Sequence, residues 1–384
     1  MSTIRVNAIK NTNTTDGGIG IDGSGHVTIE GQSLPSAGPL SNRNLIINGA
    51  MQVAQRGTTS TSSDFQTIDR FYYNFGNTLA GTQSQQSLSS GTPYNEGFRS
   101  FYRFAISTPG SATSTYCQLI QGIEAQNLAT SGWDYVASSS YATVSFWVRS
   151  SVAQTFYGAL KTDDGTAQNY VFSFALSADT WTKVEKTIPG NSNVTINNDN
   201  GLGAELIIYP FMGTNYSDSG VNVDAWQAYS GSTRVPDMAT SWVLTNGATF
   251  DVTGVQLEVG EVATPFEHRS YGDELVRCQR YFMRYTHVTN GADGGIYQVA
   301  GWTNSAAYGA IRFPTTMRTG PSFSYNGGTF YGNGTVDTSI TLTQNGSSVH
   351  AAEVQVTDIS ISGGDAGWVR LNTSGHHMSF SAEL

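Results

Sequence analysis

The sequence predicts an all-β protein of two or three domains. It has 384 residues, of which only 12% are charged, and 43 are glycines. Its apolar residues fall mostly in short runs, and clusters of Gly, Ser, Thr, Asn and Asp separate these runs. Many short strands joined by tight turns are typical of this pattern, and a chain of this length is long enough for more than one core.

The first 33 residues form a separate small element in this prediction. Ile4 and Val6 alternate with polar residues, and Ile19 and Ile21 precede an Asp-Gly turn and a second short run, 27–29. Two alternating runs around such a turn predict a β-hairpin, which is too small to bury a core of its own. We therefore expect residues 1–33 to attach to a partner. Residues 34–41, with two prolines and a glycine, are expected to be a linker.

Residues 42–270 contain about ten strand-like segments with turn signals between them, which predicts a two-sheet sandwich or a barrel. The expected strands include 45–47, 71–73, 101–104, 116–120, 143–148, 155–160, 170–174, 182–185, 204–209 and 252–258. The widest interval without a clear strand is 213–241, and long loops on rigid sandwiches often carry function.

One helix is expected, at 271–283, followed by a second all-β domain at 284–384. Tyr271, Leu275, Cys278 and Phe282 are spaced four, three and four residues apart, which gives one apolar stripe on a helix. The stripe is too short for a free coiled coil, so we expect it to pack on a neighbouring domain or on symmetry-related copies. In the second case these residues form a trimer interface.

The charge argues against several classes of partner. The formal net charge is −10, and the 19 basic residues are scattered, which disfavours nucleic acid. The sequence contains no apolar run long enough to insert into a membrane. Cys117 and Cys278 lie far apart and form no paired motif, so we expect two reduced thiols in a protein assembled in a cytoplasm.

Motifs for catalysis and cofactors are not convincing. Residues 18–23 match GxGxxG, but a strand follows where a dinucleotide site needs a helix. The six histidines form no metal-binding pattern, and the acidic residues lie in ordinary loops. Asp251, which opens a strand, is the one candidate for a structural Ca²⁺ ligand, together with loop carbonyls. We therefore expect no catalytic residues and no cofactor.

Aromatic residues are the positive signal for function. The chain has 7 Trp and 19 Tyr, more than a sandwich core of this size needs. Such rings stack on sugar faces while the hydroxyl or N–H group bonds a substituent. The candidates near glycines or in turns are Trp226, Tyr229, Trp302, Tyr325 and Tyr331.

An ordered set of motifs over about 42–283 resembles a module of bacteriophage tail fibres and related virion fibre proteins. The set begins with the segment 44–57, NLIINGAMQVAQRG. It continues with IDRFY at 68–72, QLIQGIE at 118–124, VSFWVRS at 144–150, WTK at 181–183, VQLEVG at 255–260, ATPFE at 263–267 and RCQRYF at 277–282. The segment 313–321, FPTTMRTGP, resembles a motif of the tip domains of such fibres.

The resemblance implies a jelly roll similar to carbohydrate-binding modules, in a non-enzymatic virion protein that is usually a homotrimer. It also implies a phage tail adaptor, nozzle or other virion protein as the partner of the N-terminus, and host-surface polysaccharide as the ligand. The implied location is the virion tail, after assembly in the host cytoplasm. Two alternatives stay open, namely a tailspike-like glycan depolymerase and a fibre mounted on the capsid.

Overall fold

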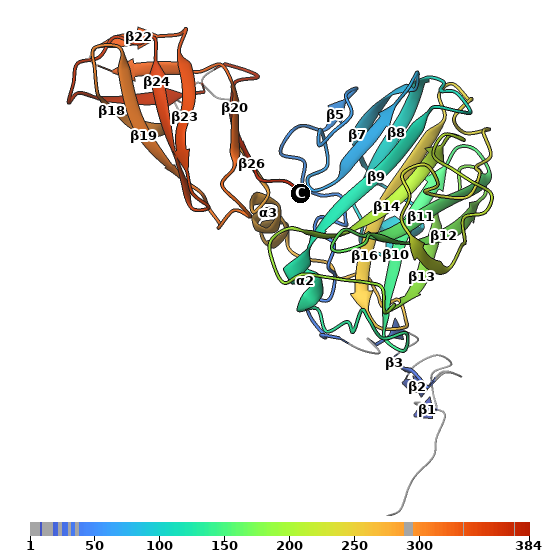
Figure 1. Cartoon of the computed structure of the whole chain (residues 1–384). Helices are drawn as coiled ribbons and strands as arrows, with labels where there is room; N and C mark the ends of the chain where they lie inside the picture. The colour runs from blue at the N-terminus through green and yellow to red at the C-terminus, as the bar shows by residue number, and fades with distance from the viewer. Residues whose placement is uncertain are drawn as a thin grey trace, which may run out of the picture. The chain divides into compact units, whose positions relative to one another are not determined.

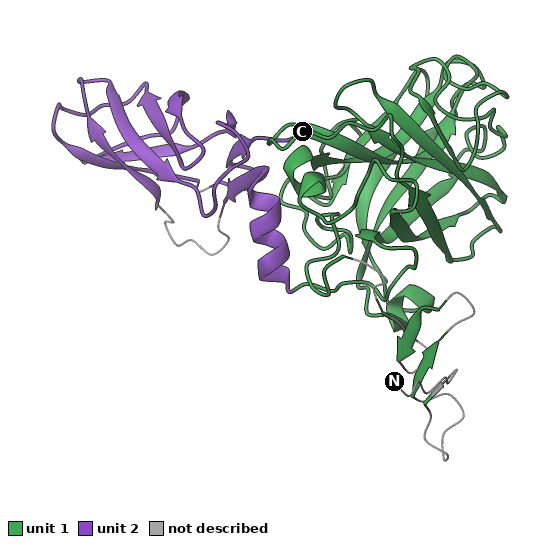
Figure 2. Cartoon of the chain, turned by 60° about the horizontal axis from the view of Figure 1, so that its bottom comes forward, with its two compact units in different colours: residues 1–269 green, residues 270–384 purple. Residues whose placement is uncertain are grey.

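The chain folds into two compact units, residues 1–269 and 270–384 (Figure 2). The computed structural model describes residues 8–9, 18–21, 25–29, 32–34, 38–287, 295–332, 334–371 and 373–384. Strands dominate both units, as Figure 1 shows, and the all-β prediction is confirmed. Each unit is described by itself.

A small antiparallel sheet opens the first unit. Its strands, in order, are β1 (Ala8–Ile9), β2 (Ile19–Ile21), β3 (Val27–Ile29) and β4 (Gln32–Ser33). β2 and β3 form the predicted hairpin, in which Ile19 lies opposite Ile29. The side chains of Ile19 and Ile21 are exposed. Ile4 and Val6 lie outside the described residues.

Two six-stranded antiparallel sheets form the jelly-roll sandwich of the first unit. The β10–β16 sheet has the order β13 (Thr182–Pro189), β10 (Tyr141–Ser150), β16 (Thr249–Val259), β8 (Ser100–Thr108), β7 (Ala80–Ser87) and β5 (Thr59–Ser60). The β11–β14 sheet has the order β15 (Ala225–Ala228), β12 (Gln168–Leu176), β11 (Gln154–Thr162), β14 (Leu202–Met212), β9 (Tyr116–Glu124) and β6 (Tyr72–Gly76).

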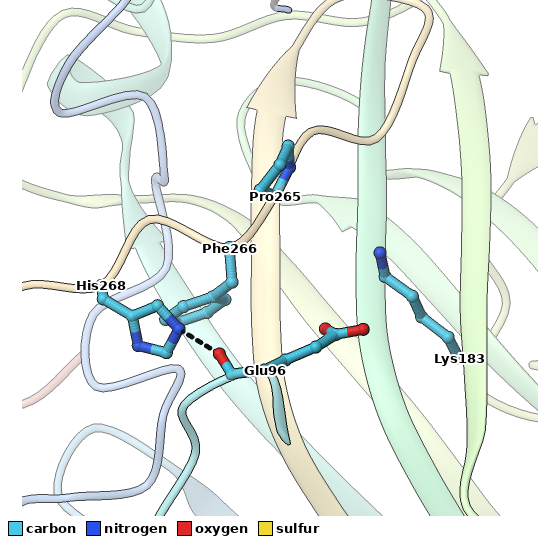
Figure 3. Close-up of a pocket in the computed structure, with 5 residues that line it drawn as sticks. All are labelled: Glu96, Lys183, Pro265, Phe266 and His268. Carbon is cyan, nitrogen blue, oxygen red and sulfur yellow. Dashed lines mark hydrogen bonds between the residues drawn. The ribbon is translucent and has the colours of Figure 1, made fainter. Parts of the chain in front are cut away.

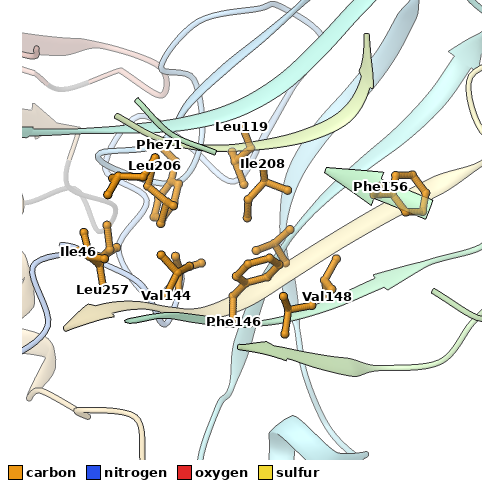
Figure 4. Packing of buried hydrophobic residues seen from close by; sticks show 14 of the residues in the cluster. Ile46, Phe71, Leu119, Val144, Phe146, Val148, Phe156, Leu206, Ile208 and Leu257 are labelled. Atoms are coloured by element: carbon orange, nitrogen blue, oxygen red, sulfur yellow. The ribbon is translucent and has the colours of Figure 1, made fainter. Parts of the chain in front are cut away.

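The main core lies between these two sheets (Figure 4). In β10, Val144, Phe146 and Val148 point inward because alternate residues of a strand share a face. They meet Leu206 and Ile208 of β14, which are equally buried. The alternation that predicted these strands is therefore the alternation between core and outer face.

Both sheets also carry partly covered outer faces. On the β11–β14 sheet, the segment 213–241 packs through Val235 against a second apolar cluster that includes Ile207 and Tyr209. This segment contains the edge strand β15, which its sequence did not reveal. On the β10–β16 sheet, a smaller cluster includes Phe101 and Trp147, next to the short helix α1 (Thr92–Asn95). Another short helix, α2 (Ala125–Ala129), follows β9.

The second unit begins with helix α3 (Tyr271–Gln279), where the Ser270 hydroxyl caps the first turn by accepting the Asp273 N–H at 3.2 Å. The helix is shorter than the predicted 271–283. Phe282 instead starts strand β17 (Phe282–Thr286), because this aromatic-rich segment pairs with strand β26 (His377–Ser381). Phe282 is therefore not a helix residue, which corrects the prediction.

The rest of the second unit is a three-stranded and a seven-stranded antiparallel sheet around one core. The first sheet has the order β17, β26 and β20 (Ser322–Asn326). The second has the order β22 (Thr335–Asp337), β21 (Thr329–Gly332), β25 (Ala366–Arg370), β18 (Gly295–Gly301), β19 (Ala306–Arg312), β24 (Ala351–Thr357) and β23 (Thr341–Ser347). The shared core includes Val299, Val354, Phe330 and Phe380.

Among the described residues, no helix has the length and apolar character that a membrane crossing requires.

Candidate functional site

Asp251 lies in an ion-pair cluster on the outer face of the β10–β16 sheet. The strand register places it between Arg149 of β10 and Arg103 of β8. Its Oδ1 accepts from Arg103 Nε at 2.7 Å, and its Oδ2 accepts from Arg103 Nη2 at 2.9 Å and Arg149 Nη2 at 2.7 Å. Two guanidinium groups at these distances repel a cation, so the structure gives Asp251 a different role from the Ca²⁺ ligand suggested by the sequence. Within the described ranges, no group of three or more His, Cys, Asp or Glu side chains is placed to hold a metal.

Trp226 and Tyr229 are already engaged by the chain itself. Trp226 donates its indole N–H to the Pro189 carbonyl at 2.6 Å, and its ring packs edge-on against Tyr170. The Lys161 ammonium lies over the Tyr229 ring, with Nζ 5.0 Å from the ring centroid. Both side chains are half-buried, so neither presents a free ring for stacking on a ligand.

The four residues of the expected trimer stripe do not share one exposed face. Tyr271 is 56% exposed and Leu275 is half-buried, whereas Cys278 is fully buried. Phe282 is buried in β17. Leu275 and Tyr271 are thus the two members that remain accessible.

An open aromatic site occurs on the solvent face of the seven-stranded sheet. Trp302 follows β18 directly and is 75% exposed, the largest exposure of any Trp in the described chain. It stands edge-on to Tyr308 of β19, with the ring centroids 6.4 Å apart. The two rings border a hollow of about 450 Å³, which Ala300, Gly301 and Glu353 also line. Small residues therefore form its floor, rings form its walls, and a carboxylate lies beside them.

The register explains why these side chains share a face. Tyr308 lies opposite Ala300 on one side and opposite Gln355 on the other. Gln355 donates its amide N–H to the Tyr308 hydroxyl at 2.9 Å and so fixes the position of the hydroxyl. Paired residues of adjacent strands project to the same side of a sheet. Ala300, Tyr308 and Gln355 therefore lie in one row on the solvent face.

A second pair of rings lies on the same sheet. Tyr331 of β21 is directly opposite Trp368 of β25, which is 44% exposed. The Arg370 guanidinium lies 4.1 Å from the centroid of the Tyr331 ring. The Tyr331 side chain is thus half-buried under the Arg370 guanidinium, whereas the Trp368 side chain is exposed to solvent. Trp302, Tyr308, Tyr331 and Trp368 are called the aromatic face below.

Tyr325 lies elsewhere, on β20 of the three-stranded sheet. Its ring stacks on Phe323 with centroids 5.9 Å apart, and both rings pack on the core. They border a separate hollow of about 530 Å³ with Leu342, Thr343 and Gln344. The structure therefore brings Trp302 and Tyr331 onto one sheet and leaves Tyr325 apart from them.

The first unit has its own small hollow, of about 240 Å³, which Figure 3 shows. The side chains that line it are Glu96, Lys183, Pro265, Phe266 and His268. Lys183, Pro265 and Phe266 lie in motifs that carry the family resemblance, but the sequence indicates none of the five as a binding residue. The local signal was poor, because Glu96 lies in a polar turn and Lys183 in an amphipathic strand, and only the fold brings them together.

The segment 44–57, which carries the family resemblance, is held in place by buried polar contacts. The Asn44 side chain accepts from the Ile46 N–H at 2.9 Å and the Leu257 N–H at 3.1 Å. Gln121 of β9 binds both backbone groups of Ile47, at 2.7 and 2.8 Å. These motif residues therefore fasten the start of the sandwich to β16 and β9, and their role is structural.

Glu267 completes this set of contacts, and we expect it to make stability depend on pH. Burial raises the pKa of Glu267, but backbone hydrogen bonds from Asn44 and Arg43 and the Arg269 charge outweigh burial and hold the pKa below the ordinary 4.5. A lowered folded-state pKa stabilises the fold above 4.5, and this stabilisation is lost as the pH falls through the folded-state value.

Glu267→Gln should therefore lower the free energy of unfolding by about 1–2 kcal/mol at pH 7, through the loss of charge-assisted bonds. The deficit relative to the wild type should shrink as the pH falls below 4.5. Urea denaturation at several pH values measures it. Glu185→Gln, at a carboxylate that is 49% exposed, is the control and should show no such trend. A deficit that stays constant with pH contradicts the assignment.

Comparisons with known proteins leave the family open. No protein-family model and no curated protein matches the chain. Among solved structures, a family 4 carbohydrate-binding module is 11% identical, with a TM-score of 0.29 over 55% of this chain and 97% of the other. A putative sugar-binding protein from Bacteroides thetaiotaomicron is 11% identical, with a TM-score of 0.29 over 56% and 99%. The family 11 module from Clostridium thermocellum, solved with a mixed-linked tetrasaccharide, is 11% identical, with a TM-score of 0.26 over 54% and 98%.

Proposed function

We propose that this chain is a non-enzymatic glycan-binding protein that recognises bacterial surface polysaccharide through the aromatic face of the second unit. The observation that carries the proposal is Trp302, a ring that is 75% exposed beside Tyr308 and a carboxylate, over a hollow floored by Ala300. Two rings beside one hollow offer apolar surface that a ligand can remove from water. A sugar presents an apolar C–H face for the ring and hydroxyl groups for Glu353 and the Tyr308 hydroxyl.

The biological setting of the proposal is a bacteriophage tail fibre. Its support is the ordered motif set between 42 and 283, together with the small N-terminal sheet, whose Ile19 and Ile21 are exposed and suited to a virion partner. In this proposal the fibre is a homotrimer on the tail of the virion, its N-terminus binds a tail adaptor or nozzle, and the second unit meets the host. Three copies raise avidity without strong single sites.

Replacing Trp302 tests the glycan proposal. We expect Trp302→Ala to weaken binding about 5–30-fold, since an aromatic contact of this kind contributes about 1–2 kcal/mol. Binding of the purified full chain to immobilised bacterial polysaccharides measures it. Leu244→Ala removes an apolar side chain that is 50% exposed in the other unit, and this control should leave binding unchanged.

Wild-type binding that survives Trp302→Ala at full strength would move the site away from the aromatic face. The same incubations, assayed for new reducing ends, examine the non-enzymatic part of the proposal. Reducing ends that accumulate with time would favour the depolymerase alternative.

Light scattering tests the homotrimer. The full chain should have about three times the monomer mass of 41.1 kDa. Leu275→Asp should shift it toward the monomer, because a charge in an apolar contact is costly. Val276→Asp changes the neighbouring residue, which is 47% exposed, and should not affect assembly. A wild-type protein that stays monomeric at high concentration excludes the trimer.

A further inference from the structure

We propose that the hollow lined by Glu96, Lys183 and Phe266 is a second carbohydrate subsite, which takes a single neutral sugar residue (Figure 3). It lies wholly within residues 1–269, whereas the aromatic face lies within 270–384. The inference is therefore independent of the function proposed for the second unit. The hollow is called the Glu96–Lys183 hollow below.

The walls of this hollow are positioned by the protein before any ligand arrives. Glu96 Oε2 accepts the Trp147 indole N–H at 3.0 Å, and the Glu96 carbonyl oxygen bonds His268 Nε2 at 2.9 Å. Lys183 lies directly opposite Trp147 in the β10–β13 register. The same Trp147 therefore orients the carboxylate on one wall and stands beside the lysine on the other. Groups fixed in this way lose little entropy when a ligand binds.

The charges select the class of ligand. Glu96 supplies a hydrogen-bond acceptor on one wall. On the other wall the Lys183 ammonium pairs with Glu185 Oε1 at 3.1 Å and supplies its remaining donors. A sugar hydroxyl both donates and accepts, so adjacent hydroxyls satisfy both walls at once. A uronic acid that approaches Lys183 also comes close to the Glu96 and Glu185 carboxylates, and an amino sugar that approaches Glu96 also comes close to the Lys183 ammonium. A neutral sugar avoids both repulsions.

The apolar lining and the size fit one sugar ring. Phe266 is held edge-on against Phe98, with the ring centroids 4.9 Å apart, and the exposed Pro265 lines the hollow next to it. Together they give an apolar surface for the C–H face of a sugar. The volume of about 240 Å³ is below the range of about 300–1,000 Å³ that holds drug-sized ligands. The hollow therefore suits one residue of a glycan better than an extended chain.

Trp147 provides the reporter for the experiment, because its indole N–H donates to Glu96 in the wall of the hollow. The full chain, labelled with ¹⁵N at its seven tryptophans, gives seven indole signals, and Trp147→Phe and Trp302→Phe assign two of them. Methyl glucoside, methyl galactoside and methyl mannoside are titrated separately to high millimolar concentration. We expect the Trp147 signal to shift saturably with at least one of them.

Variants decide whether the shift reports on this hollow. Glu96→Gln and Lys183→Met should each weaken the apparent affinity about tenfold, while the control Lys186→Met, on the same strand but outside the hollow, should not change it. Methyl glucuronide and methyl glucosaminide should bind more weakly than the best neutral probe.

No movement of the Trp147 signal with any neutral probe overturns the proposal, as does a shift that persists unchanged in the Glu96→Gln/Lys183→Met double variant. A charged probe that binds more tightly than every neutral probe overturns the assignment to neutral sugars. The Trp302 signal reads the aromatic face in the same spectra, so failure there counts against the proposed function alone.

Discussion

Asp251→Ala should lower the free energy of unfolding of the first unit by about 3–5 kcal/mol, the loss typical of removing one partner from a buried ion pair. The Asp251 side chain is fully buried, and the side chains of Arg103 and Arg149 are 30% and 26% exposed. Without the carboxylate, both guanidinium groups lose their hydrogen-bonded partner, and only the more distant charge of Asp179 remains near Arg103. Neither guanidinium group can become fully solvated, because each packs on an aromatic ring. The guanidinium carbon of Arg149 lies 4.7 Å from the centroid of the Trp181 ring, and that of Arg103 lies 5.3 Å from the centroid of the Phe101 ring.

A matched variant separates the charge effect from the loss of side-chain volume. Replacing the whole cluster, as Arg103→Met, Arg149→Met and Asp251→Leu together, should recover most of the stability, since apolar side chains of similar volume often equal or exceed a buried ion pair. Urea denaturation of the three proteins measures the effect. If Asp251→Ala lowers the free energy of unfolding by less than about 1 kcal/mol, water stabilises the two arginines as well as Asp251 does. The cluster then contributes little to stability.

The sequence was sufficient to predict strands whose side chains alternate between core and surface. β10 is the clearest case, since Val144, Phe146 and Val148 enter the core. Strand β7 was missed because its sequence, AGTQSQQS, has almost no apolar signal. Gln83 is nevertheless buried there, where its side-chain amide donates to the Ser62 carbonyl at 2.6 Å. A polar strand that is stabilised by side-chain hydrogen bonds carries no hydrophobic period for a sequence pattern to reveal.

The opposite error occurred at 45–47, where an apolar run was expected to be a strand. Ile46 is fully buried, yet the segment forms no regular strand in the structure. The side chains of Asn44 and Gln121 explain this, because Asn44 accepts the Ile46 N–H and Gln121 bonds both backbone groups of Ile47, which a strand would pair. The apolar residues of 45–47 therefore predict burial correctly, but they do not predict the backbone conformation.

The candidate site was only partly accessible to sequence reasoning. A ring near a glycine or in a turn predicts exposure, and this holds for Trp302 but not for Trp226, whose indole bonds a carbonyl 37 residues away. Asp251 is similar, because its partners Arg103 and Arg149 lie 148 and 102 residues away. Exposure and pairing of this kind depend on long-range strand register, which local composition does not encode.

Asn48→Ala should cost about 5 kcal/mol of unfolding free energy, about 4 kcal/mol from the four hydrogen bonds that converge on this residue and about 1 kcal/mol from its backbone. The Asn48 side chain donates to the Val53 carbonyl at 2.8 Å and the Asp69 carbonyl at 3.0 Å. It also accepts the N–H groups of Gln52 and Val53, both at 2.9 Å. Asn48 is fully buried, so truncation leaves these backbone groups without partners in the core, and each net hydrogen bond contributes about 1 kcal/mol.

The backbone of Asn48 adds a second, separable contribution. Its φ is +61°, in the left-handed region that asparagine tolerates and alanine does not, at about 1 kcal/mol. Asn48→Gly loses the same four hydrogen bonds but relieves this strain, so it should be about 1 kcal/mol more stable than Asn48→Ala. Asn48→Asp keeps the two acceptor contacts but turns a carboxylate oxygen toward the Val53 and Asp69 carbonyl oxygens in the core, so it should be no more stable than Asn48→Gly. Urea denaturation of the three variants gives this order if the side chain fixes the turn. If Asn48→Ala and Asn48→Gly both match the wild type, the turn is held by the Gly49 contacts with β16 instead, where an added Cβ would collide with the Val255 carbonyl oxygen.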